Sequence, residues 1–354
     1  MNEKISKKIT LVNFVMTLSI VLYHCYAWYT KVPMYESFDK NIFNIFNNVA
    51  YSMGTIATGV FFLMSGFLLY YNCNNSKEMK LKIKRRAKSL IIPFVIWNLF
   101  TFVYLFFREG LILPFENLKD LIMHLTLDPY NIPLWYIFTL ILLLIPAMLI
   151  IKLKGKKIIS LVIYFIICII TICYCNLEFF KSIRVFEIQR IIQYLPLYFL
   201  GVIAGLNYSD SVLNEKLYSK KINIISFFIL ISFALIRNSI SNQIIKEILM
   251  SFESIFVWFA IPCVFNNFNK ELSTSLAFKC SFMIYVLHCP FLLDVIDKVL
   301  TPKILSAKIF YPVQIIIIDI IIVALVWIAS ALITIVLKRF LNKKIFNIIT
   351  GGRI

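Results

Sequence analysis

Residues 9–29 read ITLVNFVMTLSIVLYHCYAWY, an apolar stretch that a single histidine, His24, interrupts near its end. A helix needs about 20 apolar residues to cross the hydrocarbon core of a bilayer, which is the length of this stretch. A polar side chain inside that core costs several kcal/mol unless it finds a partner. The stretch therefore predicts a membrane span in which His24 faces other helices or a cavity rather than lipid.

The composition of the whole chain is that of a polytopic membrane protein. Hydrophobic residues make up 60% of the 354 positions and charged residues only 15%, whereas soluble domains carry about 25% charged residues. No internal repeat and no Gly/Ser-rich linker divides the chain, so we expect an all-α membrane helical bundle that forms one domain over residues 1–354. The expected spans are ten: 9–29, 47–71, 90–107, 133–151, 158–175, 190–206, 222–236, 250–265, 276–297 and 312–337.

The placement of lysine and arginine predicts the orientation of these spans. With a cytoplasmic N-terminus, 24 of the 36 Lys and Arg residues fall on the inner side and 12 on the outer side. This asymmetry follows the positive-inside rule and predicts about ten transmembrane helices in the cell membrane, with both termini cytoplasmic. The net charge of +18 is then mainly a topology signal. We expect the lipid bilayer and no nucleic acid as a partner, and the oligomeric state stays open, a homo-oligomer included.

The cysteines do not suggest a metal site. Seven of the eight lie in apolar stretches, and the sequence contains no CxxC pair and no His-rich spacing. A zinc site needs closely spaced sulfur or nitrogen ligands of that kind. We therefore expect no metal and no tightly bound cofactor, and we interpret the cysteines as small apolar filler.

A second histidine also interrupts an apolar run, in FMIYVLHCPFLL, where His288 precedes Pro290. Proline removes a helical hydrogen bond, so we expect a kink there. Tyr285 lies three residues before His288 and shares its helix face. Because an imidazole can accept and return a proton near neutral pH, two inward-facing histidines predict a polar centre on two spans. The third histidine, His124, is expected to be simply solvated in an outer loop.

The second span contains GVFFLMSGFLLYY, in which Ser65 and Gly66 are small. Small residues allow either close helix packing or access of a ligand to the backbone, and the sequence leaves both open. A G-x-S-x-G elbow is absent, which argues against a serine nucleophile of the hydrolase type.

A basic cluster, KEMKLKIKRRAK, precedes the third span and carries seven Lys or Arg residues. Topology and anionic lipid headgroups account for such a cluster. A phosphate-bearing ligand entering at the inner face would need the same charges. Arg85 and Arg86 are the better candidates for that role, because arginine binds phosphate through two parallel hydrogen bonds.

Two groups of residues mark the outer side. Trp135 and Tyr136 begin the fourth span at interface depth, where an aromatic belt and a platform for sugar rings are both open interpretations. Arg184, Glu187 and Arg190 follow at three-residue spacing before the sixth span. They either pair along one helix face or line the mouth of an outer cavity.

Taken in order, these segments resemble the acyltransferase-3 family, the bacterial integral membrane O-acyltransferases of envelope glycans. The resemblance extends from residue 18 to about 292, and ten spans are also typical of the family. Six segments in register carry it: SIVLYH, GVFFLMSGFLL, KRRAKSLIIPFVIWN, PLWYIFTLILLLIP, YLPLYFLGVIAG and CSFMIYVLHCPF.

The resemblance implies an acyl-coenzyme A donor, often acetyl-coenzyme A, that enters from the cytoplasm. Its acyl group would pass to a hydroxyl of a lipid-linked or exported glycan. His24 matches the implied catalytic base, and Tyr285 and His288 match the late motif that would assist it. The implied donor-binding positions are Ser65, Gly66, Arg85 and Arg86; for the acceptor we expect Trp135, Tyr136, Glu187 and Arg190.

The chain departs from the family at one place. Many members carry an arginine eleven residues before the first-span histidine and an acidic residue three positions earlier, where this chain has Asn13 and Thr10. The family also includes members with proposed transport roles. A transporter of a small amino acid or related metabolite, with the histidines as a proton relay, is therefore the alternative function.

Overall fold

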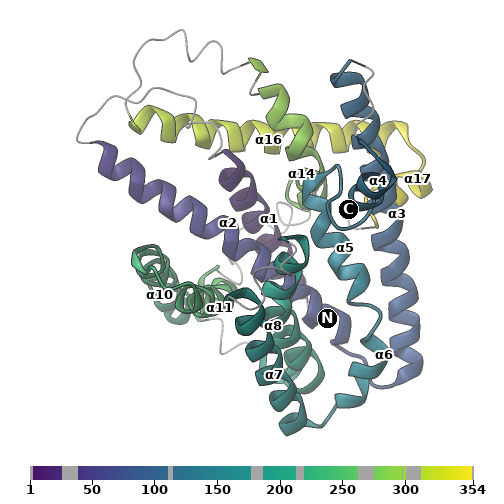
Figure 1. Ribbon diagram of the computed structural model, residues 1–354, viewed down its shortest axis with the longest axis vertical. Coiled ribbons are helices and arrows are strands. Elements are labelled where there is room, and N and C mark those ends of the chain that lie inside the picture. The colour runs from purple at the N-terminus through teal and green to yellow at the C-terminus, as the bar shows by residue number, and fades with distance from the viewer. Residues whose placement is uncertain are drawn as a thin grey trace. The chain divides into compact units, whose positions relative to one another are not determined.

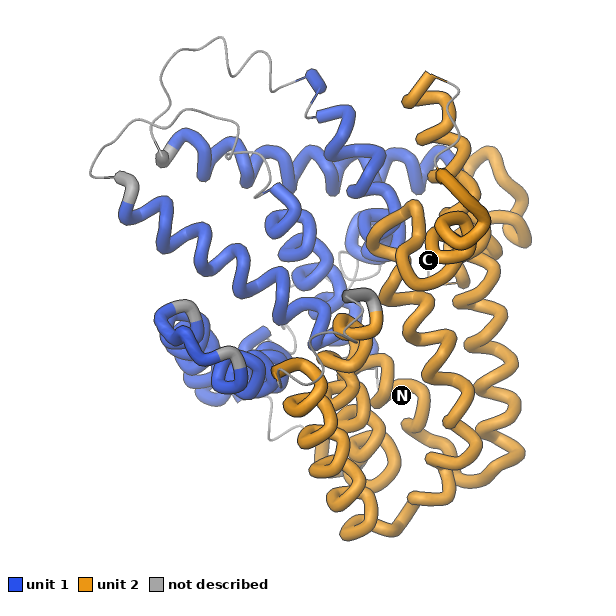
Figure 2. Tube along the Cα trace, in the orientation of Figure 1, with its two compact units in different colours: residues 1–61, 214–337 blue, residues 62–213, 338–354 orange. Residues whose placement is uncertain are grey.

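The computed structural model describes residues 3–25, 39–110, 115–176, 186–212, 219–261, 275–296, 298–299 and 312–352. The described residues form helices and turns without any strand, which confirms the all-α fold class (Figure 1). They divide into two compact units, each built from separate parts of the chain (Figure 2). Unit 1 comprises residues 1–61 and 214–337, and unit 2 comprises 62–213 and 338–354. The single membrane domain stays a prediction.

Six of the described helices are long and apolar enough to cross a membrane. A bent pair, 132–142 with 147–153, makes a seventh if it forms one span. The count of ten spans and the cytoplasmic termini stay predictions. The six are α1 (Glu3–Cys25), α2 (Asp39–Tyr70), α3 (Ser76–Arg108), α7 (Lys157–Asn176), α8 (Phe186–Asn207) and α16 (Pro312–Phe340).

Helices α7 and α16 present most of their apolar surface to the outside. Only 17% of the most apolar window of α7 is buried inside the protein, and 28% of that of α16. A soluble protein rarely exposes contiguous apolar patches of this extent. In a bilayer the same residues face lipid at no cost, because the helix satisfies its own backbone hydrogen bonds. The chain is a multi-pass membrane protein.

Unit 1 contains α1, residues 39–61 of α2, and most of α16, with five further elements. These are α10 (Lys220–Ser239), α11 (Gln243–Ala260), α13 (Leu276–Lys279), α14 (Ser281–Leu287) and the π-helical turn η6 (His288–Leu292). An aromatic cluster fastens α1 and α13 to α16: the Phe14 ring centroid lies 4.7 Å from that of Phe278 and 5.2 Å from that of Trp327. The indole nitrogen of Trp327 also donates to the Ala277 carbonyl over 3.0 Å.

Helices α10 and α11 pack side by side and share a buried ion pair (Figure 1). Arg237 Nε lies 3.1 Å from Glu253 Oε2, and the two side chains are 7% and 0% exposed. Arg237 also donates to the Thr55 hydroxyl of α2 over 3.1 Å. A buried charge without a partner is very costly. The pair therefore fixes α10 and α11 in one register, because a shift of either helix would separate the two charges.

Unit 2 contains α3, α7, α8, the end of α2 and a set of shorter elements, with α7 packed along α8 (Figure 1). The shorter elements are α4 (Leu118–His124), η2 (Ile132–Leu134), α5 (Trp135–Leu142), α6 (Ala147–Ile150), η3 (Ile151–Leu153), α9 (Ser209–Val212) and α17 (Lys343–Ile349).

Three glycines bring the backbones of α2 and α8 into direct contact within unit 2. A methyl group on Gly66 would collide with the Tyr198 carbonyl, and one on Gly201 with the Leu63 carbonyl. One on Gly205 would lie 2.6 Å from the Phe67 carbonyl oxygen. Small residues at such positions let membrane helices approach closely and gain van der Waals contact. Helix packing thus accounts for Gly66, and its role in donor binding stays a prediction.

The buried ion pair predicts a specific pattern of unfolding free energies. Arg237→Met alone leaves the Glu253 carboxylate buried without its partner, so we expect a loss of about 3–5 kcal/mol. The double variant Arg237→Met/Glu253→Leu removes both charges and should regain most of that loss. Denaturant unfolding in detergent micelles measures both, and equal losses in the single and double variants would contradict a coupled pair.

The glycine contact predicts a second stability effect. Gly201→Val inserts a side chain where the α2 backbone lies, so we expect a loss of at least about 1–3 kcal/mol. The matched control is Ala204→Val, at a half-exposed position on the same helix, which should change stability by less than about 0.5 kcal/mol. Thermal unfolding of the purified proteins compares the two, and an equal shift would argue against the close approach.

Candidate active site

The two histidines that interrupt apolar runs lie together within unit 1. His24 occupies the last turn of α1 and His288 begins η6. Their ring centroids are 5.2 Å apart, with an angle of 46° between the ring planes. The Tyr285 ring lies 6.4 Å from that of His288. The structure therefore brings together the three residues that the sequence suggested as a polar centre.

Two local features place His288 at this point. Helix α1 packs against α13 and α14, so the end of α1 faces the start of η6. The helix breaks directly after His288, where Cys289 has an extended backbone with φ −132° and ψ 131°. This confirms the kink predicted from Pro290, whose ring is incompatible with a regular helix.

One hydrogen bond determines how the His288 ring is protonated. Its Nδ1 lies 3.1 Å from the Ile284 carbonyl oxygen, and a carbonyl can only accept. In the neutral ring Nδ1 therefore carries the proton, which leaves Nε2 with a free lone pair. Nε2 is buried and has no hydrogen-bond partner among the described residues. The ring thus presents a proton acceptor in an apolar environment.

A carboxyl group that the sequence analysis missed lies in the same unit. Asp319 of α16 is fully buried, and neither of its oxygens has a hydrogen-bond partner in the described part of the chain. It lies close enough to interact electrostatically with Cys25, the residue after His24. The signal was present in the sequence as a lone acid within IIIIDIIIVAL, because ionisable residues inside membrane helices tend to be functional.

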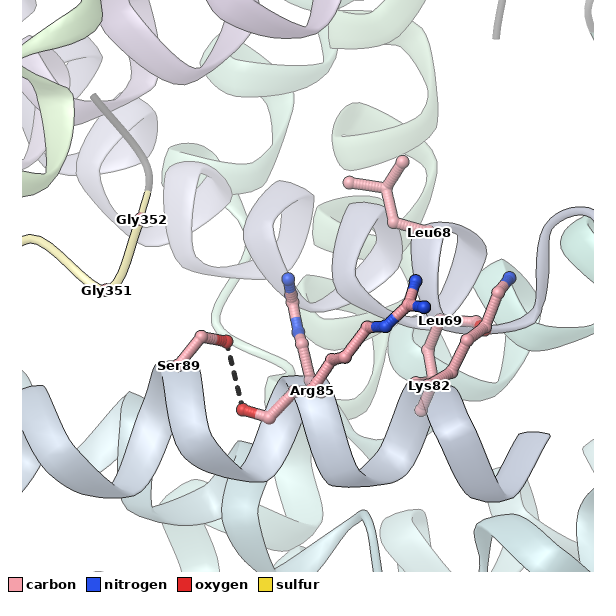
Figure 3. Close-up of a pocket in the computed structure, with 8 residues that line it drawn as sticks. Leu68, Leu69, Lys82, Arg85, Ser89, Gly351 and Gly352 are labelled. Carbon is pink, nitrogen blue, oxygen red and sulfur yellow. Dashed lines mark hydrogen bonds between the residues drawn. The ribbon is translucent and has the colours of Figure 1, made fainter. Parts of the chain in front are cut away.

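Unit 2 contains a basic pocket of about 380 Å³ at the start of α3 (Figure 3). Lys82, Arg85 and Arg86 line one side of it together with Ser89. Neither arginine has a carboxylate partner among the residues that the structure describes. Pockets of about 300–1,000 Å³ are typical of small-molecule sites, and unpaired guanidinium groups suit phosphate. The structure thus places both predicted donor arginines in one concave site.

Ser65 and Tyr136, predicted for the donor and the acceptor, contact each other. The Ser65 hydroxyl lies 2.7 Å from the Tyr136 hydroxyl. The Tyr136 ring packs edge-on against Phe62 at 4.9 Å, and Phe62 stacks on Tyr194 at 5.3 Å. These contacts join α2, α5 and α8 into one aromatic core within unit 2.

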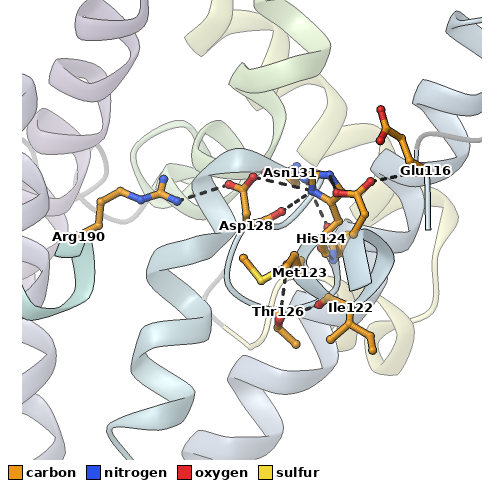
Figure 4. A network of polar contacts seen from close by, with 10 residues as sticks. Glu116, Ile122, Met123, His124, Thr126, Asp128, Asn131 and Arg190 are labelled. Atoms are coloured by element: carbon orange, nitrogen blue, oxygen red, sulfur yellow. Dashed lines mark hydrogen bonds and ion pairs between the residues drawn. The ribbon is translucent and has the colours of Figure 1, made fainter. Parts of the chain in front are cut away.

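Arg190 of α8 contacts Asp128 and one other outer-side candidate, Trp135. Its Nη2 lies 3.4 Å from Asp128 Oδ1 (Figure 4). Its guanidinium lies 5.2 Å from the Trp135 ring centroid. A cation over an indole face is attracted by the ring quadrupole. Arg184 and the side chain of Glu187 lie outside the described part of the chain, so their predicted pairing with Arg190 stays a prediction.

The prediction that His124 is simply solvated is wrong. Its Nδ1 lies 2.8 Å from the Asp128 carbonyl oxygen, and its Nε2 lies 3.4 Å from Asp120 Oδ1 (Figure 4). The ring stacks on Tyr130 with centroids 4.7 Å apart. Residues 124–131 turn back on themselves, which brings acceptors and an aromatic face to the imidazole. His124 therefore holds this turn in shape.

Residues 7–337 match the model of the acyltransferase-3 family, which describes an acyltransferase domain. The match covers nearly the whole chain, so the protein belongs to this family. Membership indicates a membrane acyltransferase. No curated protein and no solved structure matches the chain.

The hydrogen bond of His288 predicts its tautomer. We expect ¹⁵N NMR of histidine-labelled protein to show the neutral His288 ring protonated at Nδ1, because the Ile284 carbonyl beside that nitrogen can only accept a hydrogen bond. The spectrum of a His288→Ala variant identifies the signal by its loss. A ring protonated mainly at Nε2 would contradict the geometry.

Proposed function

We propose that this protein is an O-acyltransferase of the cell membrane. It would move an acyl group, in our proposal acetyl, from acyl-coenzyme A to a hydroxyl of a cell-envelope or exported glycan. The observation that carries the proposal is the pair of adjacent intramembrane histidines in a chain that belongs to an acyltransferase family. The transporter alternative has no specific observation in its favour.

In the proposed reaction His24 acts as a general base. Its neutral ring removes the proton from the acceptor hydroxyl while the hydroxyl oxygen attacks the thioester carbonyl carbon. The carbon–sulfur bond then breaks, and the imidazolium returns the proton to the departing thiolate. The products are an ester and free coenzyme A, with no net change in the enzyme. Catalysis by a positioned base contributes about 10²–10⁴-fold.

His288 and Tyr285 would support that base. Because Nδ1 of His288 donates to the Ile284 carbonyl, its Nε2 is free to accept a hydrogen bond. Accepting from the N–H of His24 would orient the His24 ring and stabilise the imidazolium that forms, as the third group of a catalytic triad does. The Tyr285 hydroxyl is our candidate donor to the oxyanion of the tetrahedral intermediate.

The basic pocket of unit 2 would hold the phosphate end of the donor. Arg85 and Arg86 supply planar groups with several N–H donors, and the pocket volume suits a nucleotide portion rather than a whole coenzyme. For the acceptor we propose Trp135, Tyr136 and Arg190, with Glu187, as groups that contact sugar rings and hydroxyls.

Turnover of radiolabelled acetyl-coenzyme A by purified protein tests the function. We expect wild-type protein to transfer the label to glycan acceptor or to hydrolyse the thioester slowly. His24→Ala, His24→Asn and His24→Gln should each reduce the rate by about 10²–10⁴-fold, because the amide side chains cannot take up a proton.

The matched control is Ser19→Ala on the same helix, where the hydroxyl donates to the carbonyl of Val15 one turn earlier. It should retain wild-type turnover and unfold at the same temperature as the His24 variants. Near-wild-type turnover in a folded His24→Ala protein would remove His24 as the base. Folded wild-type protein that neither binds nor turns over acetyl-coenzyme A would overturn the donor assignment.

A further inference from the structure

The basic pocket of unit 2 has a wall that comes from the end of the chain. Gly351 and Gly352 line it opposite the arginines of α3, and Leu68 and Leu69 of α2 complete it (Figure 3). The region that matches the acyltransferase-3 family ends at residue 337. The part of the chain that forms this wall therefore lies after the matched region.

Several contacts hold this segment, residues 342–352, in place against α3. Asn342 caps α17 by accepting from the Ile345 amide over 2.8 Å. The side chain of Phe346, in the same helix, is buried. The Trp97 indole of α3 donates to the Ile349 carbonyl over 3.1 Å. The buried Thr350 hydroxyl donates to the Phe346 carbonyl over 2.9 Å. The wall is thus part of the folded core of unit 2.

The two glycines of the wall have different roles. Gly351 has φ +63°, and a methyl group on it would lie 2.6 Å from the Ser89 carbonyl oxygen, so the segment presses directly on α3. Gly352 ends α17 by donating its amide to the Asn347 carbonyl over 2.8 Å. It has φ +67°, and a methyl group on it would meet no atom within 4 Å. A side chain at Gly352 therefore extends into open space at the pocket.

The charge of the pocket indicates what it binds. Three cations line it, and none of its eight lining residues is acidic. Lys82 donates to the Leu69 carbonyl over 3.3 Å and to the Tyr71 carbonyl, which directs its ammonium group to the rim formed by α2. Both arginines lack a carboxylate partner in the described residues. Two or three convergent cations without anions are the usual setting for a phosphate ester.

We propose that residues 342–352 form one wall of the donor's phosphate site and that Gly352 lies beside the bound phosphate group. The affinity for the donor then depends on a segment that lies after the region matched by the family model. This proposal rests on the proposed function, because it takes the phosphate to be that of acyl-coenzyme A. It adds one residue, Gly352, that lies beside the phosphate group of the donor.

Charge at residue 352 tests the proposal. Asn and Asp are nearly identical in shape, and both tolerate positive φ. Gly352→Asn and Gly352→Asp therefore share any steric and backbone effect and differ in one negative charge. We expect coenzyme A to bind the Asp variant about tenfold more weakly than the Asn variant in zwitterionic nanodiscs at low salt. The difference should shrink towards 1 M salt, where the Debye length falls to about 3 Å.

Gly110 provides the matched control pair, Gly110→Asn and Gly110→Asp. It has φ +75° and open space at the same position, and it also lies in unit 2. It follows α3 about 38 Å along the helix from Arg85, which is longer than the Debye length of about 30 Å at 0.01 M salt. We expect equal affinities for coenzyme A in this pair. Arg86→Gln serves as the positive reference and should weaken binding in the Gly352 and Gly110 backgrounds alike.

The outcomes separate this proposal from the proposed function. If Arg86→Gln weakens coenzyme A binding while the two Gly352 variants bind equally, the wall is not at the phosphate site and only this proposal falls. If wild-type protein does not bind coenzyme A, the donor assignment falls and this proposal falls with it. A Gly352→Asp effect on binding to phosphatidylglycerol nanodiscs, with none on coenzyme A, would assign the pocket to a lipid headgroup and overturn the proposal.

Discussion

Hydrocarbon offers no hydrogen bonds, so each polar group that enters it must find a partner within the protein. The backbone meets this constraint by forming helices throughout the described spans. Small hydroxyl side chains meet it locally, as when Thr17 donates to the Asn13 carbonyl over 2.6 Å and Thr334 to the Ser330 carbonyl over 2.6 Å. Buried polar groups that lack such a partner in the described part of the chain are therefore the first candidates for a chemical role. Among the described residues, Nε2 of His288 and the Asp319 carboxyl group have no hydrogen-bond partner, and both lie in unit 1.

The two units of the protein contain different kinds of chemistry. Unit 1 holds His24 and His288 in ring contact, and the ion pair of Arg237 and Glu253 joins its neighbouring helices. Unit 2 holds the basic pocket of Lys82, Arg85 and Arg86. In the proposed function, loss of a unit 1 histidine lowers the rate of the chemical step, whereas loss of a unit 2 arginine weakens donor binding.

Much of the candidate site was predictable because its signals are local. The proline two residues after His288 removes a backbone hydrogen bond from the helix, and the structure confirms the break at Cys289. Two arginines next to each other before a span were visible as a phosphate candidate. The wrong prediction for His124 has the opposite cause. Two of its partners, Asp128 and Tyr130, come from a turn whose course depends on packing against α3, where Asn98 donates to the His124 carbonyl over 2.9 Å.

By itself the sequence determined that this is a helical membrane protein, located the six helices that are long and apolar enough to cross a bilayer, and indicated that the histidines within apolar runs deserve a functional interpretation. Hydrophobicity, helix length and proline geometry act over one or two turns, so they can be read along the chain. Only the tertiary structure decided that His24 meets His288, that Asp319 is buried near Cys25, and that Gly351 presses on Ser89. Each of these contacts joins residues far apart in the chain. Such contacts depend on how helix surfaces fit together, and an apolar helix surface in lipid carries little information about its partner.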